Sequence, residues 1–412
     1  MQKKISALLR RFLCGVLCAG LILTEPSPVI AENGGTAVAE ATPTPDPHMP
    51  YYYETASTDK LEGWPAGPSI EGQAAYLMDM NTGSVLYAKN EDLQLYPASI
   101  TKIMTALLAC ENLDMDGKLV MSQSAAYGIE PGSSSIYADT GEEFTMEQAM
   151  MALMLESANE IALALAEETS GSVKKFVELM NQRARNIGCT GTHFNNPNGL
   201  TDGTHYTTAH DMALIARTAW QNPYFRKFST TLSYEIPPTN IRSEALPMLN
   251  HHKMMSGLSY AYDGVLGGKT GYTEAAGNTL VTFATRNGIT VVCVVMNSIG
   301  GAYADTAALL DYAYDQFSIV MIPKTIRSYP LKLLPSERFI LREDEDLYAF
   351  YYMYRTYVTI PSGTDVTTLK EETEFFPAGV GPARIRHSYY FNGYLVGIRD
   401  QYEKEVLSDL LL

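Results

Sequence analysis

Apolar and polar residues alternate along two pairs of short segments in this chain. The first pair, 75–80 and 84–88, is separated by Asn-Thr-Gly, and the second pair, 279–285 and 289–296, by Arg-Asn-Gly. Alternation around a short turn that contains glycine predicts an antiparallel hairpin. Because the second pair is apolar at nearly every position, its strands are expected to be covered on both faces. The pattern therefore predicts a central, mainly antiparallel sheet.

Between the hairpins the apolar residues recur at helical spacing. The predicted helices are 99–110, 146–155, 158–168 and 212–220. Thr145 and Gln148 form a predicted capping box in front of the second helix. Strands at both ends of a region with helices between them are typical of an α+β sandwich, which we expect over residues 69–320.

The remaining residues, 321–412, predict a small all-β domain. Short apolar runs at 338–341, 347–353, 357–360 and 394–398 alternate with turns rich in proline, glycine and charge. The final segment, 399–412, is short and net acidic, whereas a helix that binds a membrane surface is basic. Peripheral membrane attachment through the C-terminus is therefore not supported by the sequence.

The first 68 residues are predicted to lie outside the folded body. Residues 1–31 carry basic residues, a short apolar run over 12–23 and a small residue at position 31, which is typical of a cleaved signal peptide. An uncleaved N-terminal anchor is the alternative. Residues 32–68 are rich in proline, threonine and glycine and predict a linker. Only the tyrosines at 51–53 suggest a contact with the folded body.

Charge and cysteine content exclude several kinds of partner. The net charge is −16, and loss of residues 1–31 would leave 26 basic against 45 acidic residues. Nucleic acids and anionic lipid surfaces are therefore not expected partners. Three cysteines lie beyond the signal segment, far apart and in apolar surroundings, so a disulfide framework is not expected.

Ser99 and Lys102 are the strongest candidates for chemistry. A Ser-x-x-Lys spacing arises about once by chance in a chain of this length, and the same spacing occurs at 57–60 and 172–175. Those two copies lie in polar surroundings. Ser99 instead begins an apolar helix, so Lys102 is expected to be buried on the same helix face, one turn from the hydroxyl.

Two further short motifs follow in a meaningful order. Ser157-Ala-Asn159 supplies a second hydroxyl and a carboxamide, and Lys269-Thr270-Gly271 supplies a cation beside a predicted strand. Taken alone, the first is also a common helix cap and the second an ordinary exposed turn. Together with Ser99 and Lys102 they supply the groups needed for nucleophilic attack on an acyl group that lies near a carboxylate of the substrate.

The three motifs resemble the active-site signature of penicillin-binding proteins and serine β-lactamases. The surrounding sequence is closer to the low-molecular-weight D-alanyl-D-alanine carboxypeptidases. The resemblance extends from about residue 72 to 317, and its marks lie at 97–102, 196–200, 205–209 and 268–277. It implies a sandwich with an antiparallel sheet, helices on both faces and a helical subdomain. It also implies an enzyme that removes the terminal D-alanine from peptidoglycan stem pentapeptides and is acylated by β-lactam antibiotics. The signal-like N-terminus predicts export, and because the sequence has no glycine-rich phosphate loop and no cysteine pairs at zinc spacing, no cofactor is expected.

The resemblance assigns a role to each motif residue. Ser99 would be the nucleophile and Lys102 its base, neutral because of burial and the nearby charge of Lys269. Ser157 would relay a proton to the leaving amine. The expected substrate-binding residues are Asn159, Lys269, Thr270, Gly271 and Tyr272; among them, Gly271 would allow close approach of the substrate, and the Tyr272 amide would complete an oxyanion hole with that of Ser99.

Other classes of protein remain open at this stage. A β-lactamase shares the three motifs, but no segment between Ser157 and Lys269 resembles the loop that supplies the deacylating glutamate in class A enzymes. A non-catalytic wall-binding module would be expected to have lost Ser99 or Lys102. A metal site at His193, His205 and His210 is not expected, because the spacing of zinc peptidases is absent. Where the family often has Asp, His and Ser, this chain has Glu160, Asn198 and Thr207, which bears on substrate preference.

Overall fold

The computed structural model describes residues 50–322, 326–330, 348–352, 356–376 and 384–402. The α-helices are α1 (Lys102–Asn112), α2 (Gln123–Tyr127), α3 (Met146–Leu155), α4 (Asn159–Ser170), α5 (Val173–Ile187), α6 (Ala209–Trp220), α7 (Pro223–Thr230) and α8 (Ala302–Gln316). Short 3-10 helices are η1 (Pro50–Tyr53), η2 (Ser57–Lys60), η3 (Ala98–Thr101) and η5 (Val366–Thr368). The strands up to residue 298 are β1 (Gly72–Asp79), β2 (Val85–Lys89), β3 (Lys118–Val120), β4 (Glu143–Thr145), β5 (Ser233–Ile236), β6 (Leu246–Leu249), β7 (Val265–Thr273), β8 (Gly277–Arg286) and β9 (Ile289–Ser298). The later strands are β10 (Phe317–Met321), β11 (Ile326–Pro330), β12 (Tyr348–Tyr352), β13 (Tyr357–Pro361), β14 (Lys370–Phe376), β15 (Arg384–Phe391) and β16 (Tyr394–Tyr402).

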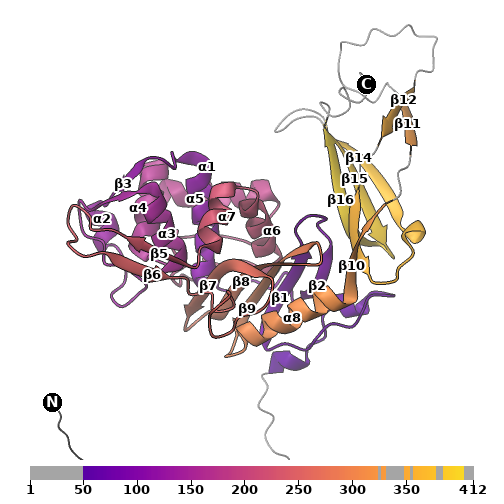
Figure 1. The fold of residues 1–412 in the computed structure, drawn as a ribbon, viewed down its shortest axis with the longest axis horizontal. Helices are drawn as coiled ribbons and strands as arrows, with labels where there is room; N and C mark the ends of the chain where they lie inside the picture. The colour runs from indigo at the N-terminus through magenta and orange to yellow at the C-terminus, as the bar shows by residue number, and fades with distance from the viewer. Residues whose placement is uncertain (1–49, 323–325, 331–347, 353–355, 377–383, 403–412) are drawn as a thin grey trace, which may run out of the picture. The chain divides into compact units, whose positions relative to one another are not determined.

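A five-stranded antiparallel sheet forms the centre of the fold, in the order β2-β1-β9-β8-β7 (Figure 1). Successive side chains of a strand point to opposite faces. On one face of β9, the core beneath the helices α1–α7 contains Val292, Val294 and Met296. On the other face, the core beneath α8 contains Val291, Cys293 and Val295. The prediction that these strands are covered on both faces is confirmed.

The helices between the hairpins form where the apolar spacing predicted them. Helix α3 begins behind the predicted capping box, in which Thr145 Oγ1 accepts from the Gln148 amide at 3.2 Å and Gln148 Oε1 accepts from the Thr145 amide at 2.8 Å. Helix α6 starts three residues earlier than predicted, because Thr208 caps it by accepting from the Asp211 amide at 3.0 Å.

The linker predicted over 32–68 is wrong for residues 50–68, which pack on the folded body. Trp64 is 7% exposed, and its indole N–H donates to the Leu86 carbonyl at 3.0 Å. The Nζ of buried Lys89 donates to the Tyr51 carbonyl at 2.6 Å and to two further carbonyls, so the tyrosine cluster does contact the body. A segment rich in proline and glycine can still pack on a folded body when burial of one large apolar side chain, here Trp64, stabilises the contact. Residues 1–49, including the predicted signal segment, lie outside the described residues.

The strands after α8 contact the turn of the first hairpin. Strand β10 pairs with β13, so the domain boundary expected at 320 falls inside a paired strand. From β13, the Thr359 hydroxyl donates to buried Asp79 at 2.6 Å, and its carbonyl accepts from Ser84 at 2.8 Å. Strands β14, β15 and β16 form a separate antiparallel sheet. The predicted run 338–341 and residues 403–412 of the acidic final segment lie outside the described residues.

Within the described part of the chain, no helix is both long and apolar enough to cross a membrane.

Candidate active site

Ser99 lies in a tight turn between β2 and α1, at the start of η3. The preceding residue, Ala98, has φ of +50°, a conformation that costs free energy for a residue with a side chain. The turn is held from two sides. The Thr279 hydroxyl on β8 donates to the Pro97 carbonyl at 2.8 Å, and Gly199 (φ +89°) packs so closely that a Cβ there would lie 1.9 Å from the Ala98 carbonyl oxygen. The nucleophile is thus placed by elements distant in sequence.

Lys102 is fully buried and approaches Ser99 with its amine. Its Nζ lies 3.0 Å from Ser99 Oγ, 2.7 Å from Asn159 Oδ1 and 2.7 Å from the Asn198 carbonyl oxygen. Burial, aided by the positive charge of Lys269, lowers the pKa of Lys102 well below its ordinary value. Asn159 Oδ1 and the Asn198 carbonyl can only accept hydrogen bonds. A neutral Lys102 therefore donates to those two and directs its lone pair at the Ser99 hydroxyl.

Ser157 and Asn159 border the same space from the junction of α3 and α4. Ser157 has φ of +59°, a second strained residue, and its buried Oγ has no hydrogen-bond partner among the described residues. An unpaired hydroxyl at a buried site is costly unless a ligand satisfies it. Asn159 is the first residue of α4, and its amide nitrogen donates to the Ser134 carbonyl at 2.9 Å.

Strand β7 supplies the third motif on the opposite side of Ser99. Lys269 is 1% exposed, and its Nζ donates to the Thr270 carbonyl at 3.0 Å. Burial lowers the pKa of Lys269 to about 7, against the opposing charge of Glu156. The Tyr272 side chain is exposed beside the site.

The structure gives a second physical reason for glycine at position 271, besides the predicted close approach of the substrate. A Cβ at Gly271 would lie 2.3 Å from Thr279 Oγ1 and 2.9 Å from the Ser99 amide nitrogen. Glycine is therefore required for β7 to pack against η3, rather than only for a substrate to approach the strand.

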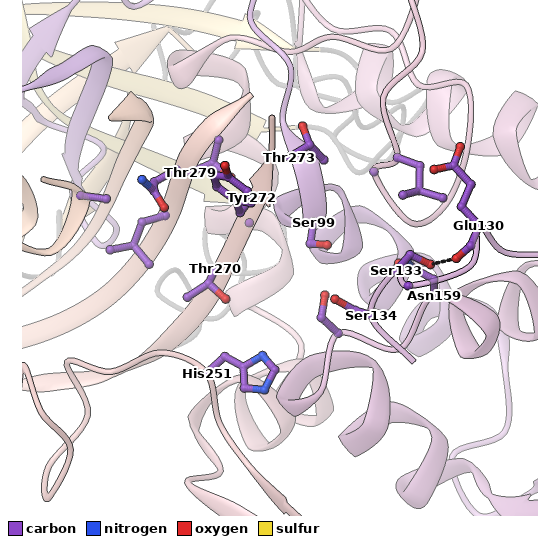
Figure 2. Close-up of a pocket in the computed structure, with 18 of the residues that line it drawn as sticks. Ser99, Glu130, Ser133, Ser134, Asn159, His251, Thr270, Tyr272, Thr273 and Thr279 are labelled. Atoms are coloured by element: carbon purple, nitrogen blue, oxygen red, sulfur yellow. Dashed lines mark hydrogen bonds between the residues drawn. The ribbon is translucent and has the colours of Figure 1, made fainter. Parts of the chain in front are cut away.

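These residues surround one cavity of about 560 Å³ (Figure 2). Ser99, Ser157, Asn159, Thr270, Gly271 and Tyr272 line it. Lys102 and Lys269 are not among the lining residues and lie behind its wall. Five of the six positions come from two parts of the sequence, 157–159 and 270–272, that are separate from the turn that carries Ser99. The fold therefore brings all three predicted motifs to one place.

The structure adds residues that the sequence did not assign. His251 lines the cavity, and its Nε2 lies 3.2 Å from Glu156, whose pKa is lowered chiefly by this hydrogen bond. Buried Glu160 holds the loop 135–138 by accepting from Ser135 Oγ at 2.7 Å and from the Ile136 amide at 2.8 Å. The only sequence signal for this loop was its run of glycine and serine after Pro131.

The histidines considered for a metal site have other surroundings. His205 accepts at Nδ1 from the Asn195 amide at 2.9 Å, so its Nε2 donates to Thr101 Oγ1 at 2.9 Å. Burial lowers the pKa of His205 to about 4, which keeps the ring neutral. Across the described ranges, no three His, Cys, Asp or Glu side chains gather closely enough to hold a metal ion. Cys110, Cys189 and Cys293 are free thiols.

Comparison with known proteins identifies relatives. A sequence model of the D-alanyl-D-alanine carboxypeptidase family matches residues 62–300. The D-alanyl-D-alanine carboxypeptidase DacF of Bacillus subtilis (strain 168) is 35% identical over 252 residues, which are 60% of this chain and 63% of that protein. The D-alanyl-D-alanine carboxypeptidase of Streptomyces sp. (strain K15) is 33% identical over 258 residues, which are 60% of this chain and 88% of that protein. The match thus spans just under two thirds of the Bacillus protein.

Solved structures agree with these sequence matches. The crystal structure of the Streptomyces K15 DD-transpeptidase aligns with a TM-score of 0.57 and 30% identity over 61% of this chain and 100% of that one. The D-alanyl-D-alanine carboxypeptidase DacD from Francisella tularensis aligns with a TM-score of 0.62 and 26% identity over 82% of this chain and 93% of that one. The predicted sandwich fold is confirmed.

The fold and the site together define a serine peptidase of the penicillin-binding class. The chain belongs to the D-alanyl-D-alanine carboxypeptidase family, the low-molecular-weight branch that the motifs resembled.

Proposed function

We propose that this enzyme removes the terminal D-alanine from peptidoglycan stem pentapeptides through an acyl-enzyme on Ser99. The observation that carries the proposal is the 3.0 Å contact between Lys102 Nζ and Ser99 Oγ at the wall of a 560 Å³ cavity. A buried amine with a lowered pKa is a suitable base for a serine hydroxyl.

Acylation then follows from the positions of the groups. Ser99 Oγ attacks the carbonyl carbon of the penultimate D-alanine as its proton passes to Lys102 Nζ. The Ser99 and Tyr272 amides receive the oxyanion. When the C–N bond breaks, the leaving amine takes a proton through the Ser157 hydroxyl, and D-alanine departs. Water repeats the sequence on the ester, which frees Ser99 and the shortened peptide.

The terminal carboxylate of the substrate is assigned to the Thr270 end of the cavity. Thr270 and His251 lie on the same side of Ser99 in Figure 2, and both line the cavity. Lys269 lies behind this wall and supplies positive charge, while Thr270 presents its hydroxyl. Removal of the carboxylate should therefore affect binding more than chemistry.

The pH dependence of kcat/KM should reveal the loss of positive charge from Lys269. Because burial lowers its pKa to about 7, Lys269 loses its charge as the pH rises through that value. We expect kcat/KM for a substrate with a free terminal carboxylate to fall above pH 7, by up to about tenfold per pH unit. On the acidic side the rate should rise with pH, because Lys102 must lose its proton to act as a base. Measurement of kcat/KM between pH 5 and pH 10 tests both limbs.

A substrate with an amidated C-terminus is the control for this experiment. It lacks the carboxylate, so its profile should keep the acidic limb and lose the alkaline one. Lys269→Ala should likewise weaken use of the carboxylate substrate more than use of the amide. Equal losses for the two substrates would show that Lys269 does not serve the carboxylate.

Activity is tested with a pentapeptide stem and with labelled penicillin. We expect stoichiometric release of D-alanine and a penicillin adduct that persists. Rapid hydrolysis of penicillin would indicate a β-lactamase. If there were neither a penicillin adduct nor release of D-alanine, the protein would be a binding module. Endopeptidase and transpeptidase reactions proceed through the same acyl-enzyme. Cleavage of purified cross-linked dimers measures the first, and transfer of the acyl group to an added amine acceptor measures the second.

We also propose that the enzyme is exported and acts on the outer side of the cytoplasmic membrane. The signal-like pattern of residues 1–31 and the wall chemistry of the family support this location. N-terminal sequencing of the exported protein should give a start near Glu32. Recovery of Met1 in a membrane fraction would instead indicate an uncleaved anchor.

A further inference from the structure

A second cavity of about 380 Å³ opens beside the active site. Residues 130–133 line both cavities, so the two cavities are neighbours. We call the second one the side cavity; it is lined by Tyr127, Glu130, Ser133, Tyr137 and Asp139, among others. Nothing in the catalytic scheme uses it.

The loop that forms the shared wall is held rigidly by the catalytic helix α4. The Ser134 carbonyl accepts from the amide of Asn159, the residue that also binds Lys102, and Glu160 holds the next turn by three hydrogen bonds. On the other side, Arg242 donates to the Ile136 carbonyl at 2.8 Å. Tyr137 is fixed at φ of +58° and remains 84% exposed. A strained, exposed aromatic residue beside an active site indicates a functional constraint.

The chemistry of the side cavity suits an alkyl chain that ends in an amine. Tyr127 and Tyr137 are 68% and 84% exposed and offer aromatic faces to methylene groups and to a cation. The Tyr127 hydroxyl donates to Asp139 at 2.6 Å, which engages that carboxylate. The Glu130 carboxylate, at the shared wall, has no hydrogen bond or ion pair with any described residue. It is therefore available to a ligand.

The direction of the substrate brings its third residue to this wall. If the terminal carboxylate lies at Thr270, the chain before the scissile bond extends past Ser99 away from Thr270, and Figure 2 shows Thr273 and Glu130 on that side. An extended chain advances about 3.4 Å per residue. The residue that precedes the two D-alanines thus lies about one residue length from Ser99, in the cavity that Glu130 also lines.

We propose that Glu130 makes the enzyme specific for stem peptides whose third residue carries a free side-chain amine. This inference rests on the proposed function and names a specificity residue for the same site. The ammonium would pair with Glu130 while its methylene groups contact Tyr127 and Tyr137. Acylation of that amine, as occurs when a stem is cross-linked, would abolish the charge and the preference.

The test compares two substrates that differ only in this amine. They are acetyl-lysyl-D-alanyl-D-alanine with a free side-chain amine and the same peptide with an Nε-acetylated lysine. For the native enzyme we expect kcat/KM to be about fivefold higher for the free amine, with a smaller ratio at high salt. In Glu130→Gln the ratio should fall to about one, while kcat/KM for the acetylated peptide stays unchanged.

Glu178→Gln is the matched control, because Glu178 is exposed on α5 and lines none of these cavities. It removes the same unit of charge and should keep the native ratio. Equal use of both peptides by the native enzyme, or a native ratio in Glu130→Gln, would overturn the inference. If neither peptide releases D-alanine, the proposed function itself fails, and this inference fails with it.

Discussion

Ser99→Ala is expected to abolish penicillin labelling and to lower D-alanine release by at least about 10⁴-fold. The Ser99 hydroxyl is the atom to which the acyl group would be attached, and Lys102 Nζ lies 3.0 Å from it. The side chain contributes little to packing, because Ser99 is half-buried at the edge of the cavity. The variant should therefore fold normally, with an unchanged circular dichroism spectrum and melting temperature.

The chain offers two controls of the same spacing. Ser57 donates to Glu91 at 2.7 Å, and Ser172 caps α5 by accepting from the Lys175 amide at 3.3 Å. Both lie outside the cavity, so Ser57→Ala and Ser172→Ala should retain labelling and activity. The second should lose about 1 kcal/mol of stability because it removes a helix cap. A covalent penicillin adduct on Ser99→Ala would refute the assignment of the nucleophile.

Lys102→Ala is expected to lower the acylation rate for every substrate by about 10³-fold, with or without a terminal carboxylate. This variant also leaves Asn159 Oδ1 and the Asn198 carbonyl without a donor. Lys102→Arg separates the two effects, because a guanidinium donates hydrogen bonds but does not give up its proton near neutral pH. If the lysine acts as a base, the arginine variant should be as slow as the alanine variant even where it folds normally.

Stopped-flow acylation by penicillin between pH 5 and pH 10 provides the readout. The native rate should fall on the acidic side as Lys102 gains a proton, and this limb should be absent from both variants. Lys175→Ala, which changes an exposed lysine of the same spacing, should behave as the native enzyme. A native rate in Lys102→Arg would show that the residue only positions its neighbours.

Much of the fold followed from local pattern. The hairpin 279–296 was predictable because its two faces are both apolar, and α3 because a Thr-x-x-Gln capping box precedes an apolar run. The segment 50–68 was not, because its few apolar residues are buried against residues far along the chain; Trp64, for example, packs against Phe317, Phe391 and Tyr394. The composition of a segment does not specify which distant residues it will pack against.

The sequence by itself determined the three motifs, their order and the family, since each motif is local and carries its own chemistry. Only the tertiary structure determined the pKa values and the geometry of the motif residues. Lys102 and Lys269 have lowered pKa values because the fold buries both beneath one cavity, and burial arises from neighbours that no spacing reveals. The strain at Ala98 and Ser157, the contact of Gly271 with the Ser99 amide, and the unpaired Glu130 beside the side cavity likewise depend on loops brought together from distant parts of the chain.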